Sequence, residues 1–268
     1  MTEIVIFGLV WIALSLAADL GLSQIKSHTM YFIISRQGHL AEDAFNFLAA
    51  FLIPVAIFVA LFLVYTLIRF RASNGDAVRS RQQTVQNKLF VTVWVALSFA
   101  LNILFWLHPT AADLETMFRR DFLANNRHDL VVDVTARQWE WIFSLPQYHI
   151  TQAVNRQGLD ALTLPVGRRV EFVLRSYDPF HSYDVQAAVI HSFWVPAFGI
   201  KEDVVPGETR YEFVTPTRTA SYATNPMVRV QCAEVCGPGH AWMEAPLSVV
   251  SGPAFDAWVK REQKRQQG

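Results

Sequence analysis

Cysteine is scarce in this chain of 268 residues, and the two cysteines, Cys232 and Cys236, lie close together. The sequence Cys-x-x-Cys-His is absent, so no covalently attached haem is expected. Glycine-rich nucleotide loops of the Rossmann and P-loop types are absent as well. Neither sign of charge is in excess, because Lys+Arg and Asp+Glu each number 23, and nothing indicates a nucleic-acid partner. The chemistry of the chain is therefore sought around its two cysteines.

Residues 231–243 read Gln-Cys-Ala-Glu-Val-Cys-Gly-Pro-Gly-His-Ala-Trp-Met and contain both thiols, His240 and Met243. A further histidine, His191, precedes them in His-Ser-Phe-Trp-Val-Pro. Two thiolates, two imidazoles and a thioether form a soft ligand set, which suits copper.

A mononuclear blue-copper site uses one cysteine, whereas two thiolates can bridge two copper ions and share one unpaired electron between them. Each copper ion then takes one terminal imidazole, from His191 or His240, and Met243 is a weak ligand. The backbone carbonyl of Glu234, between the cysteines, is a candidate for the remaining position. Gly237, Pro238 and Gly239 allow the tight turn that returns His240 to the site.

Three other interpretations compete with copper. A Cys232–Cys236 disulfide is one, but a disulfide does not explain why His240 and Met243 follow the cysteines at short spacing. A tetrahedral zinc site is another, although its histidines are usually close in sequence. The third is that His191, flanked by apolar residues, is an ordinary core histidine.

Two uncharged runs, residues 44–68 and 89–107, are long enough to cross a bilayer as helices, and Pro54 is tolerable in such a helix. A third apolar run covers residues 4–18. Ala17-Ala18 would suit signal cleavage, but the start Met-Thr-Glu lacks a positive region, so we expect a retained helix and three spans.

The connection between the two longer runs is basic, and its single acid is Asp76. Its cations are Arg69, Arg71, Arg79, Arg81 and Lys88. The positive-inside rule places this loop in the cytoplasm, so everything after about residue 110 is predicted to be extracytoplasmic.

From about residue 128 the hydrophobic period changes to two, as in Leu130, Val132 and Val134. The same alternation is read at residues 170–175, 211–213 and 228–230, and turn signals separate these segments. Many short half-buried strands indicate an all-β sandwich or barrel. The tail 254–265 reads as an amphipathic helix with Phe255, Trp258 and Val259 on one face, which we expect to pack on the barrel or on a neighbouring subunit rather than on a membrane surface.

These patterns predict the following division of the chain: a signal peptide or first transmembrane helix at 1–22, a transmembrane hairpin at 43–109, a linker at 110–127, an extracytoplasmic domain at 128–252 and a C-terminal helix at 253–268.

The run from Cys232 to Met243 resembles the binuclear copper (CuA) loop of subunit II of cytochrome c oxidases. The segment from His191 to Gly207 resembles that family's other copper-ligand segment, and Gln138-Trp139-Glu140-Trp141 resembles its aromatic stretch, with Glu140 where tyrosine is usual. The resemblance implies a cupredoxin-type Greek-key barrel with N-terminal transmembrane helices.

The resemblance also implies a function. The copper centre would accept electrons from a soluble cytochrome c-type donor and pass them to haem in catalytic subunit I, where oxygen is reduced to water. Trp139 is the residue through which electrons would reach the copper. The Glu234 carboxylate would bind a Mg²⁺ or Mn²⁺ shared with another chain. The complex, with its other oxidase subunits and its lipid, would lie in a bacterial-type inner membrane.

Acidic side chains would steer a basic donor to this domain. The candidates are Glu140, Asp178, Asp184, Glu202 and Asp203.

The sequence departs from the family pattern in places. Val91 stands three residues before Trp94, where the family has the glutamate of a proton-channel entrance, and Ser98 replaces an expected proline. We therefore expect no carboxylate from this chain in that channel. Ala188 replaces an aspartate that the family tends to have before the first copper histidine.

Other functions remain open from the sequence. A nitric oxide reductase with a copper-bearing subunit would look similar, whereas a related quinol oxidase subunit would lack the copper ligands. A membrane-anchored copper-binding or copper-delivery protein belongs to a different class and predicts labile copper. A disulfide-stapled receptor domain is a further alternative.

Overall fold

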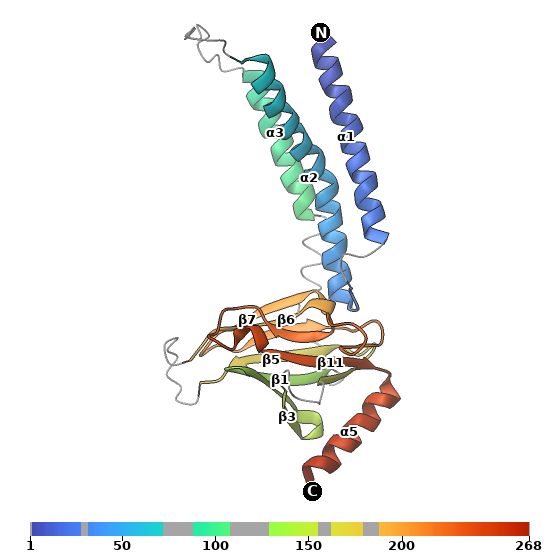
Figure 1. Cartoon of the computed structure of the whole chain (residues 1–268), viewed down its shortest axis with the longest axis vertical. Helices are drawn as coiled ribbons and strands as arrows, with labels where there is room; N and C mark the ends of the chain where they lie inside the picture. The colour runs from blue at the N-terminus through green and yellow to red at the C-terminus, as the bar shows by residue number, and fades with distance from the viewer. Residues whose placement is uncertain are drawn as a thin grey trace. The chain divides into compact units, whose positions relative to one another are not determined.

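The computed structural model describes residues 2–27, 32–71, 88–107, 129–154, 162–178 and 188–267. The chain forms two compact units, one helical and one built on β-strands (Figure 1). The first unit is Met1–Met30 with Asp43–Leu114, and the second is Tyr31–Glu42 with Glu115–Gly268. The predicted linker, 110–127, lies outside the described residues.

The helical unit contains α1 (Thr2–Ser27), α2 (Arg36–Arg69) and α3 (Lys88–Phe105). The Trp11 Nε1 of α1 donates a hydrogen bond of 2.8 Å to the carbonyl of Pro54 in α2. Glu3, at the start of α1, pairs with Arg69 at the end of α2, so these two helices run antiparallel. Phe105 of α3 contacts the ring of Phe51 in α2.

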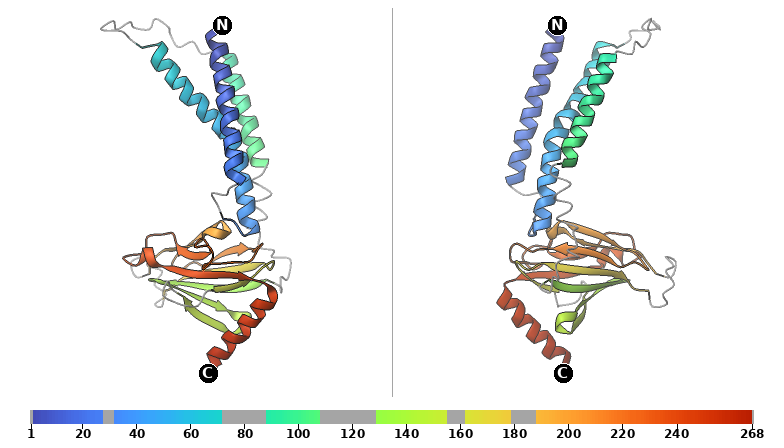
Figure 2. Two further views of the ribbon diagram at one scale, coloured as in Figure 1. Left: turned by 45° about the vertical axis from the view of Figure 1, so that its right-hand side comes forward. Right: turned by 180° about the vertical axis from the view of Figure 1, so that it is seen from behind.

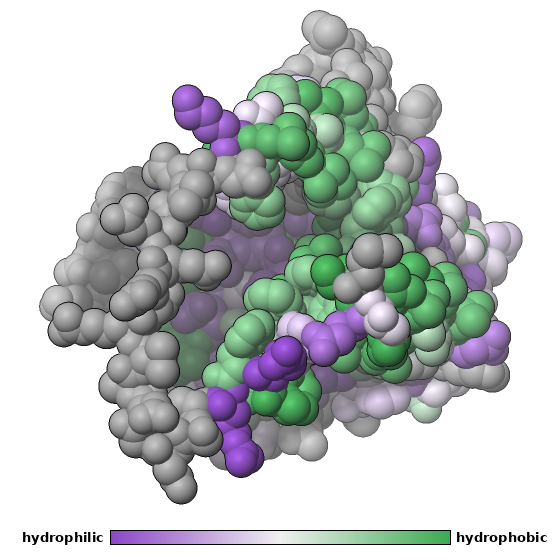
Figure 3. Space-filling view, turned by 90° about the horizontal axis from the view of Figure 1, so that it is seen from above, coloured by the Kyte–Doolittle hydropathy of each residue, from purple (hydrophilic) through white to green (hydrophobic). Residues whose placement is uncertain are grey.

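Large apolar side chains of these helices point outward, as the hydrophobic surfaces in Figure 3 illustrate. All three helices are long and apolar enough to cross a membrane. An apolar exterior on helices of this length suits lipid rather than water. The three apolar runs in the sequence therefore do form helices. Of the basic loop between α2 and α3, residues 72–87 lie outside the described part of the chain.

The β unit has two sheets, which Figure 2 shows as stacked layers. The five-stranded sheet has the order β3-β2-β1-β5-β8, with β3 Ile150–Val154, β2 Glu140–Leu145, β1 Leu130–Arg137, β5 Val170–Ser176 and β8 Arg210–Val214. The six-stranded sheet has the order β4-β11-β10-β6-β7, with β4 Leu162–Pro165, β11 Glu244–Val250, β10 Arg229–Cys232, β6 His191–Val195 and β7 Ile200–Val204. Its sixth strand, β9 (Ala220–Ser221), pairs with β11. Short 3-10 helices are η2 Pro146–Tyr148, η3 Pro196–Phe198 and η4 His240–Trp242.

The alternation read from the sequence is the burial pattern of β1, in which Leu130, Val132 and Val134 are buried. Large aromatic side chains such as Phe172 and Phe193 fill the core of the unit. One expectation is wrong: the alternation at 211–213 predicts that Glu212 points outward from β8, yet this residue is 4% exposed. The burial pattern of β8 is not a strict alternation, because Glu212, Phe213 and Val214 are all buried.

Residues 32–42 belong to the β unit, which the sequence did not indicate. Ile34 is fully buried in the hydrophobic core, and its amide donates to the carbonyl of Ala197 at 2.8 Å. Ser35 Oγ donates to the carbonyl of Phe198 and accepts from the amide of Gly38, so it caps the first turn of α2. The start of α2 is therefore part of the β unit's packing.

The C-terminal helix, α5 (Gly252–Gln267), contacts β3 and β4. Phe255, Trp258 and Val259 are buried, as the apolar face of the tail predicts. The ring of Phe255 also contacts Tyr148 of η2. The helix therefore packs on its own barrel.

Candidate metal centre

The loop between β10 and β11 carries most of the candidate ligands. Cys232 is the last residue of β10, and His240 lies in η4, just before Met243 and β11. The Cys232 amide donates to the Met243 carbonyl at 3.0 Å, which closes the base of the loop. Gly237 has a φ of 109°, which glycine adopts readily and other residues rarely do. Its carbonyl accepts a hydrogen bond from the His240 amide. The tight turn expected around Gly237 is therefore present.

His191 reaches this loop through strand pairing. It is the first residue of β6, and β6 pairs with β10 so that Phe193 lies opposite Cys232. The amide of Ala233, just after Cys232, donates to the carbonyl of Ser192 at 3.0 Å. A residue some forty positions upstream is thereby held beside the loop.

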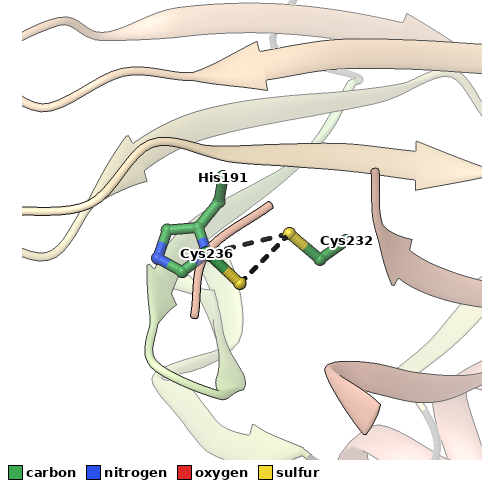
Figure 4. Close-up of side chains that lie close together, drawn as sticks. All are labelled: His191, Cys232 and Cys236. Atoms are coloured by element: carbon green, nitrogen blue, oxygen red, sulfur yellow. Dashed lines mark hydrogen bonds between the residues drawn. The ribbon is translucent and has the colours of Figure 1, made fainter. Parts of the chain in front are cut away.

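His191, Cys232 and Cys236 form a compact group whose ligand atoms all lie within 4.8 Å of one another (Figure 4). The Cys232 sulfur is 3.8 Å from His191 Nδ1 and 3.8 Å from the Cys236 sulfur. All three side chains are buried.

The other candidates contact the same pair of sulfurs. His240 Nδ1 lies 3.6 Å from the Cys236 sulfur, and the Met243 sulfur lies 3.8 Å from it. The Glu234 carbonyl lies 3.2 Å from the Cys232 sulfur. The structure thus brings together all six residues named from the sequence as ligands, and each thiol has its own neighbouring imidazole.

Burial decides the charge state of the metal-free groups. Desolvation by burial, and to a lesser extent repulsion from His240, lowers the pKa of His191 to about 4. Desolvation by burial, and to a lesser extent the charge of the neighbouring Cys232, raises the pKa of Cys236 to about 12. At pH 7 without a cation, the His191 imidazole is therefore neutral and available as a ligand, and the Cys236 thiol keeps its proton.

The donor set fits a pair of soft metal ions. Two thiols, two imidazoles, a thioether and a carbonyl are more donors than a tetrahedral zinc ion accepts. Both cysteines are free thiols, and their sulfurs are much farther apart than the ~2.05 Å of a disulfide bond. Thiolate with imidazole is the combination that copper prefers.

The aromatic stretch borders this site. Trp141 is fully buried, its ring lies 6.3 Å from that of His191, and its Nε1 donates to the Met243 carbonyl at 3.3 Å. Trp139 is 38% exposed, and its Nε1 donates to the Cys236 carbonyl at 3.1 Å. Trp139 therefore connects the surface of the domain to a candidate ligand residue. The peptide bond between Gln138 and Trp139 is cis.

The sequence reasoning missed Gln138, whose Nε2 donates to the same Cys236 carbonyl at 2.7 Å. Its position beside Trp139 was visible in the sequence, but no pattern indicated a contact with a loop nearly a hundred residues away.

The acids proposed for donor docking have varied surroundings. Glu140 pairs with Arg137, and Glu202 pairs with Arg210 at 2.9 Å. Asp203 is exposed, whereas Asp184 lies outside the described residues. Ion pairing by Arg137 and Arg210 reduces the negative potential that Glu140 and Glu202 offer to a basic partner.

Comparison with known proteins identifies the domain that carries this site. Residues 130–251 match the family model "Cytochrome C oxidase subunit II, periplasmic domain". This range contains β1 to β11 and all six candidate ligands.

Curated relatives agree with this match. The chain is 29% identical over 201 residues to cytochrome c oxidase subunit 2 of Bacillus subtilis, covering 73% of this chain and 51% of that protein. It is 26% identical over 228 residues to the alternative cytochrome c oxidase subunit 2 of Bradyrhizobium diazoefficiens, covering 76% and 73%. The subunit 2 of Thermostichus vulcanus is 35% identical over 135 residues, covering 50% and 34%. The chain thus spans about half the length of the Bacillus relative.

Among solved structures, the periplasmic domain of subunit II of cytochrome oxidase of Bradyrhizobium japonicum matches with 25% identity and a TM-score of 0.42, covering 52% of this chain and 96% of that one. The family model and the curated relatives name the same subunit, and the candidate ligands of this chain lie within the matched range. Residues 130–251 therefore form a domain of the cytochrome c oxidase subunit II family, the counterpart of its periplasmic domain.

Proposed function

We propose that this chain is the electron-accepting subunit of a membrane cytochrome c oxidase. The observation that carries the proposal is the buried donor set, in which His191 and His240 each lie beside one of two unbonded cysteine sulfurs. Its partners would be the haem-bearing catalytic subunit I, the other oxidase subunits and a soluble cytochrome c-type donor. Oxygen would be reduced to water in subunit I.

His191, Cys232, Cys236, His240, Met243 and the Glu234 carbonyl would hold a binuclear copper centre. Such a centre supplies reversible one-electron transfer with little rearrangement of its ligands. The protein's part is to keep these donors fixed and dry. Burial of His191, Cys232 and Met243 excludes water, and the Cys232–Met243 hydrogen bond fixes the two ends of the loop.

Trp139 would be the residue through which electrons arrive. Its partly exposed indole can touch a docked donor while it hydrogen-bonds the backbone of Cys236. The aromatic side chain shortens the path from the surface of the domain to the copper ligands.

Glu234 would have two functions. Its carbonyl faces the Cys232 sulfur, whereas the residue as a whole is exposed, so its carboxylate is free to point toward another chain. An oxygen ligand of this kind suits Mg²⁺ or Mn²⁺. The ion would be shared with the catalytic subunit.

The helices would place the chain in a bacterial-type inner membrane, with three spans and the copper domain on the extracytoplasmic, periplasmic side. The chain would include a transmembrane hairpin at 43–109, an extracytoplasmic domain at 128–252 and a C-terminal helix at 253–268. Arg69, Arg71 and Lys88 lie at the ends of α2 and α3, which supports a cytoplasmic loop. Val91 in α3 would offer no acid to a proton channel.

A nitric oxide reductase would use the same copper site, but the relatives from Bacillus, Bradyrhizobium and Thermostichus are cytochrome c oxidase subunits. A copper-delivery protein needs fewer ligands and faster exchange, which the buried six-donor arrangement does not favour.

The experiment that tests the proposal is optical and EPR spectroscopy of the full chain, purified in detergent and loaded with copper. The full chain is needed because residues 32–42 pack in the β unit. We expect a purple mixed-valence centre with a seven-line hyperfine pattern. The Cys232→Ser variant should lose that pattern, whereas Ser248→Ala, on β11, should keep it. A four-line spectrum of single copper, or a Cys232–Cys236 disulfide without copper, would contradict the proposal.

A further inference from the structure

The two-residue turn between β1 and β2 reaches over the metal-site loop. The turn consists of Gln138 and Trp139, since β1 ends at Arg137 and β2 begins at Glu140. The side-chain N–H groups of both turn residues donate to the carbonyl of Cys236, at 2.7 Å from Gln138 Nε2 and 3.1 Å from Trp139 Nε1. Two adjacent residues thus bind one carbonyl of a candidate ligand residue.

The loop beneath this turn fits it closely. A Cβ atom added to Gly239 would lie 2.2 Å from Cδ2 of the Trp139 indole, a distance that real Cβ atoms do not adopt. A Cβ atom added to Gly237 would lie 3.2 Å from Gln138 Nε2. The backbone of the loop therefore packs directly against both side chains, and at position 239 only glycine allows this approach.

The two hydrogen bonds have a consequence for metal binding. A backbone carbonyl has two lone pairs, and the Cys236 carbonyl has two donors to occupy them. The Glu234 carbonyl instead faces the Cys232 sulfur at 3.2 Å. Of these two loop carbonyls, the one on Cys236 is therefore held away from a metal ion, and the one on Glu234 is left to bind it.

We propose that Gln138 is a positioning residue of the metal centre: its amide fixes the Cys236 carbonyl, and thereby decides which backbone oxygen of the loop can become a ligand. This role rests on the proposed function only in so far as it concerns bound copper. It differs from the role of Trp139 as the path of electrons, because an amide side chain offers no aromatic ring. Groups that hydrogen-bond around metal ligands commonly set the orientation and the potential of a site.

The removal of the Gln138 donor has a predictable direction. The N–H dipole of Gln138 places its positive end beside the backbone of a thiolate ligand, which stabilises the more electron-rich, reduced centre. Without it, the midpoint potential should fall and the Cys236 carbonyl should become available to the metal. In the metal-free protein the loop should open more often and expose the Cys236 thiol.

The test compares the Gln138→Met variant with wild type and with Gln147→Met, all as full chains in detergent. Gln147 is a matched control, because its side chain also hydrogen-bonds backbone groups, those of Asp129 and Val131, away from the metal loop. The first readout is alkylation of Cys236 by iodoacetamide in metal-free protein. The Gln138→Met variant should react roughly fivefold faster than wild type, the change expected for one lost hydrogen bond.

The second readout is the EPR hyperfine pattern and midpoint potential after copper loading. The Gln138→Met variant should change both, whereas Gln147→Met should change neither. Alkylation rates and spectra equal to wild type would overturn the positioning role. If wild type binds no copper, the proposed function fails, yet the alkylation rates still decide whether Gln138 holds the loop.

Discussion

The helical unit and the β unit place the same kinds of residue on opposite sides. In α2, large apolar side chains such as Phe62 and Leu63 are more than half exposed. In the β unit, Phe172 and Phe193 are fully buried, and polar residues occupy much of the surface. The difference reflects two solvents: lipid accepts an apolar exterior and requires that helices satisfy their own backbone, whereas water drives apolar groups inward.

The largest effect should come from a cavity in the β unit. The Phe172→Ala substitution removes a fully buried ring that lies 4.9 Å from the ring of Phe193. We expect the free energy of unfolding to fall by about 3–5 kcal/mol. Urea unfolding of the full chain in detergent, followed by tryptophan fluorescence, measures it. The matched change in the helical unit, Phe62→Ala, removes a 52% exposed ring and should cost much less. Equal losses would contradict the contrast between the units.

A charge placed on the outer surface of α2 tests whether that surface faces lipid. Leu63 is 57% exposed in α2, and Leu63→Arg should disfavour membrane insertion by about 3 kcal/mol. The measurement is the fraction of chain recovered in washed membranes. The control is Ala254→Arg, at an exposed position on α5, which should leave that fraction unchanged. If Leu63→Arg were tolerated equally well, the outer surface of α2 would not face lipid.

A pH dependence should arise from the one buried glutamate that breaks the pattern of β8. Desolvation by burial raises the pKa of Glu212 from 4.5 to about 7. The hydrogen bond from the Phe213 amide lowers this pKa in part, and the charge of Glu202 raises it further. The folded chain therefore keeps a proton that the unfolded chain has lost, so this contribution to stability is complete below about pH 4.5 and disappears as the pH rises through about 7.

The Glu212→Gln variant should lack this dependence, because the amide does not titrate. Its stability relative to wild type should increase between pH 4.5 and pH 7, by at most about 3 kcal/mol. Urea unfolding at a series of pH values checks this. A difference between the two proteins that stays constant over this range would show that Glu212 is not protonated in the folded domain.

The smallest effect on stability should come from residues 32–42, which belong to the β unit and include the start of α2. Ser35 Oγ caps α2 at the Gly38 amide and donates to the Phe198 carbonyl. The Ser35→Ala substitution should lower the free energy of unfolding by about 1 kcal/mol. Ser23→Ala, in α1, removes an exposed hydroxyl bonded within its own helix and serves as control. Equal unfolding curves for Ser35→Ala and wild type would show that the cap does not stabilise the domain.

Several features could be predicted because their signals are local. The uncharged runs around Pro54 and Trp94 predict helices, since length and apolarity suffice for a membrane helix. The alternation at Leu130, Val132 and Val134 predicts a half-buried strand. Phe255 and Trp258 predict the buried face of the last helix. The burial of Glu212 was missed, because its neighbours Tyr211 and Phe213 suggest an alternation that the packing of β8 does not follow.

The sequence by itself determined the candidate ligand types and their order, from Cys232 to Met243, since four of the named side chains and the Glu234 carbonyl lie within one segment. Only the tertiary structure decided how His191 meets that loop, because the pairing of β6 with β10 is a contact between distant segments. The same holds for the Gln138 hydrogen bond to Cys236 and for the burial of Ile34. Local patterns report periodicity and composition, whereas these contacts depend on how the two sheets pack and which strands become neighbours.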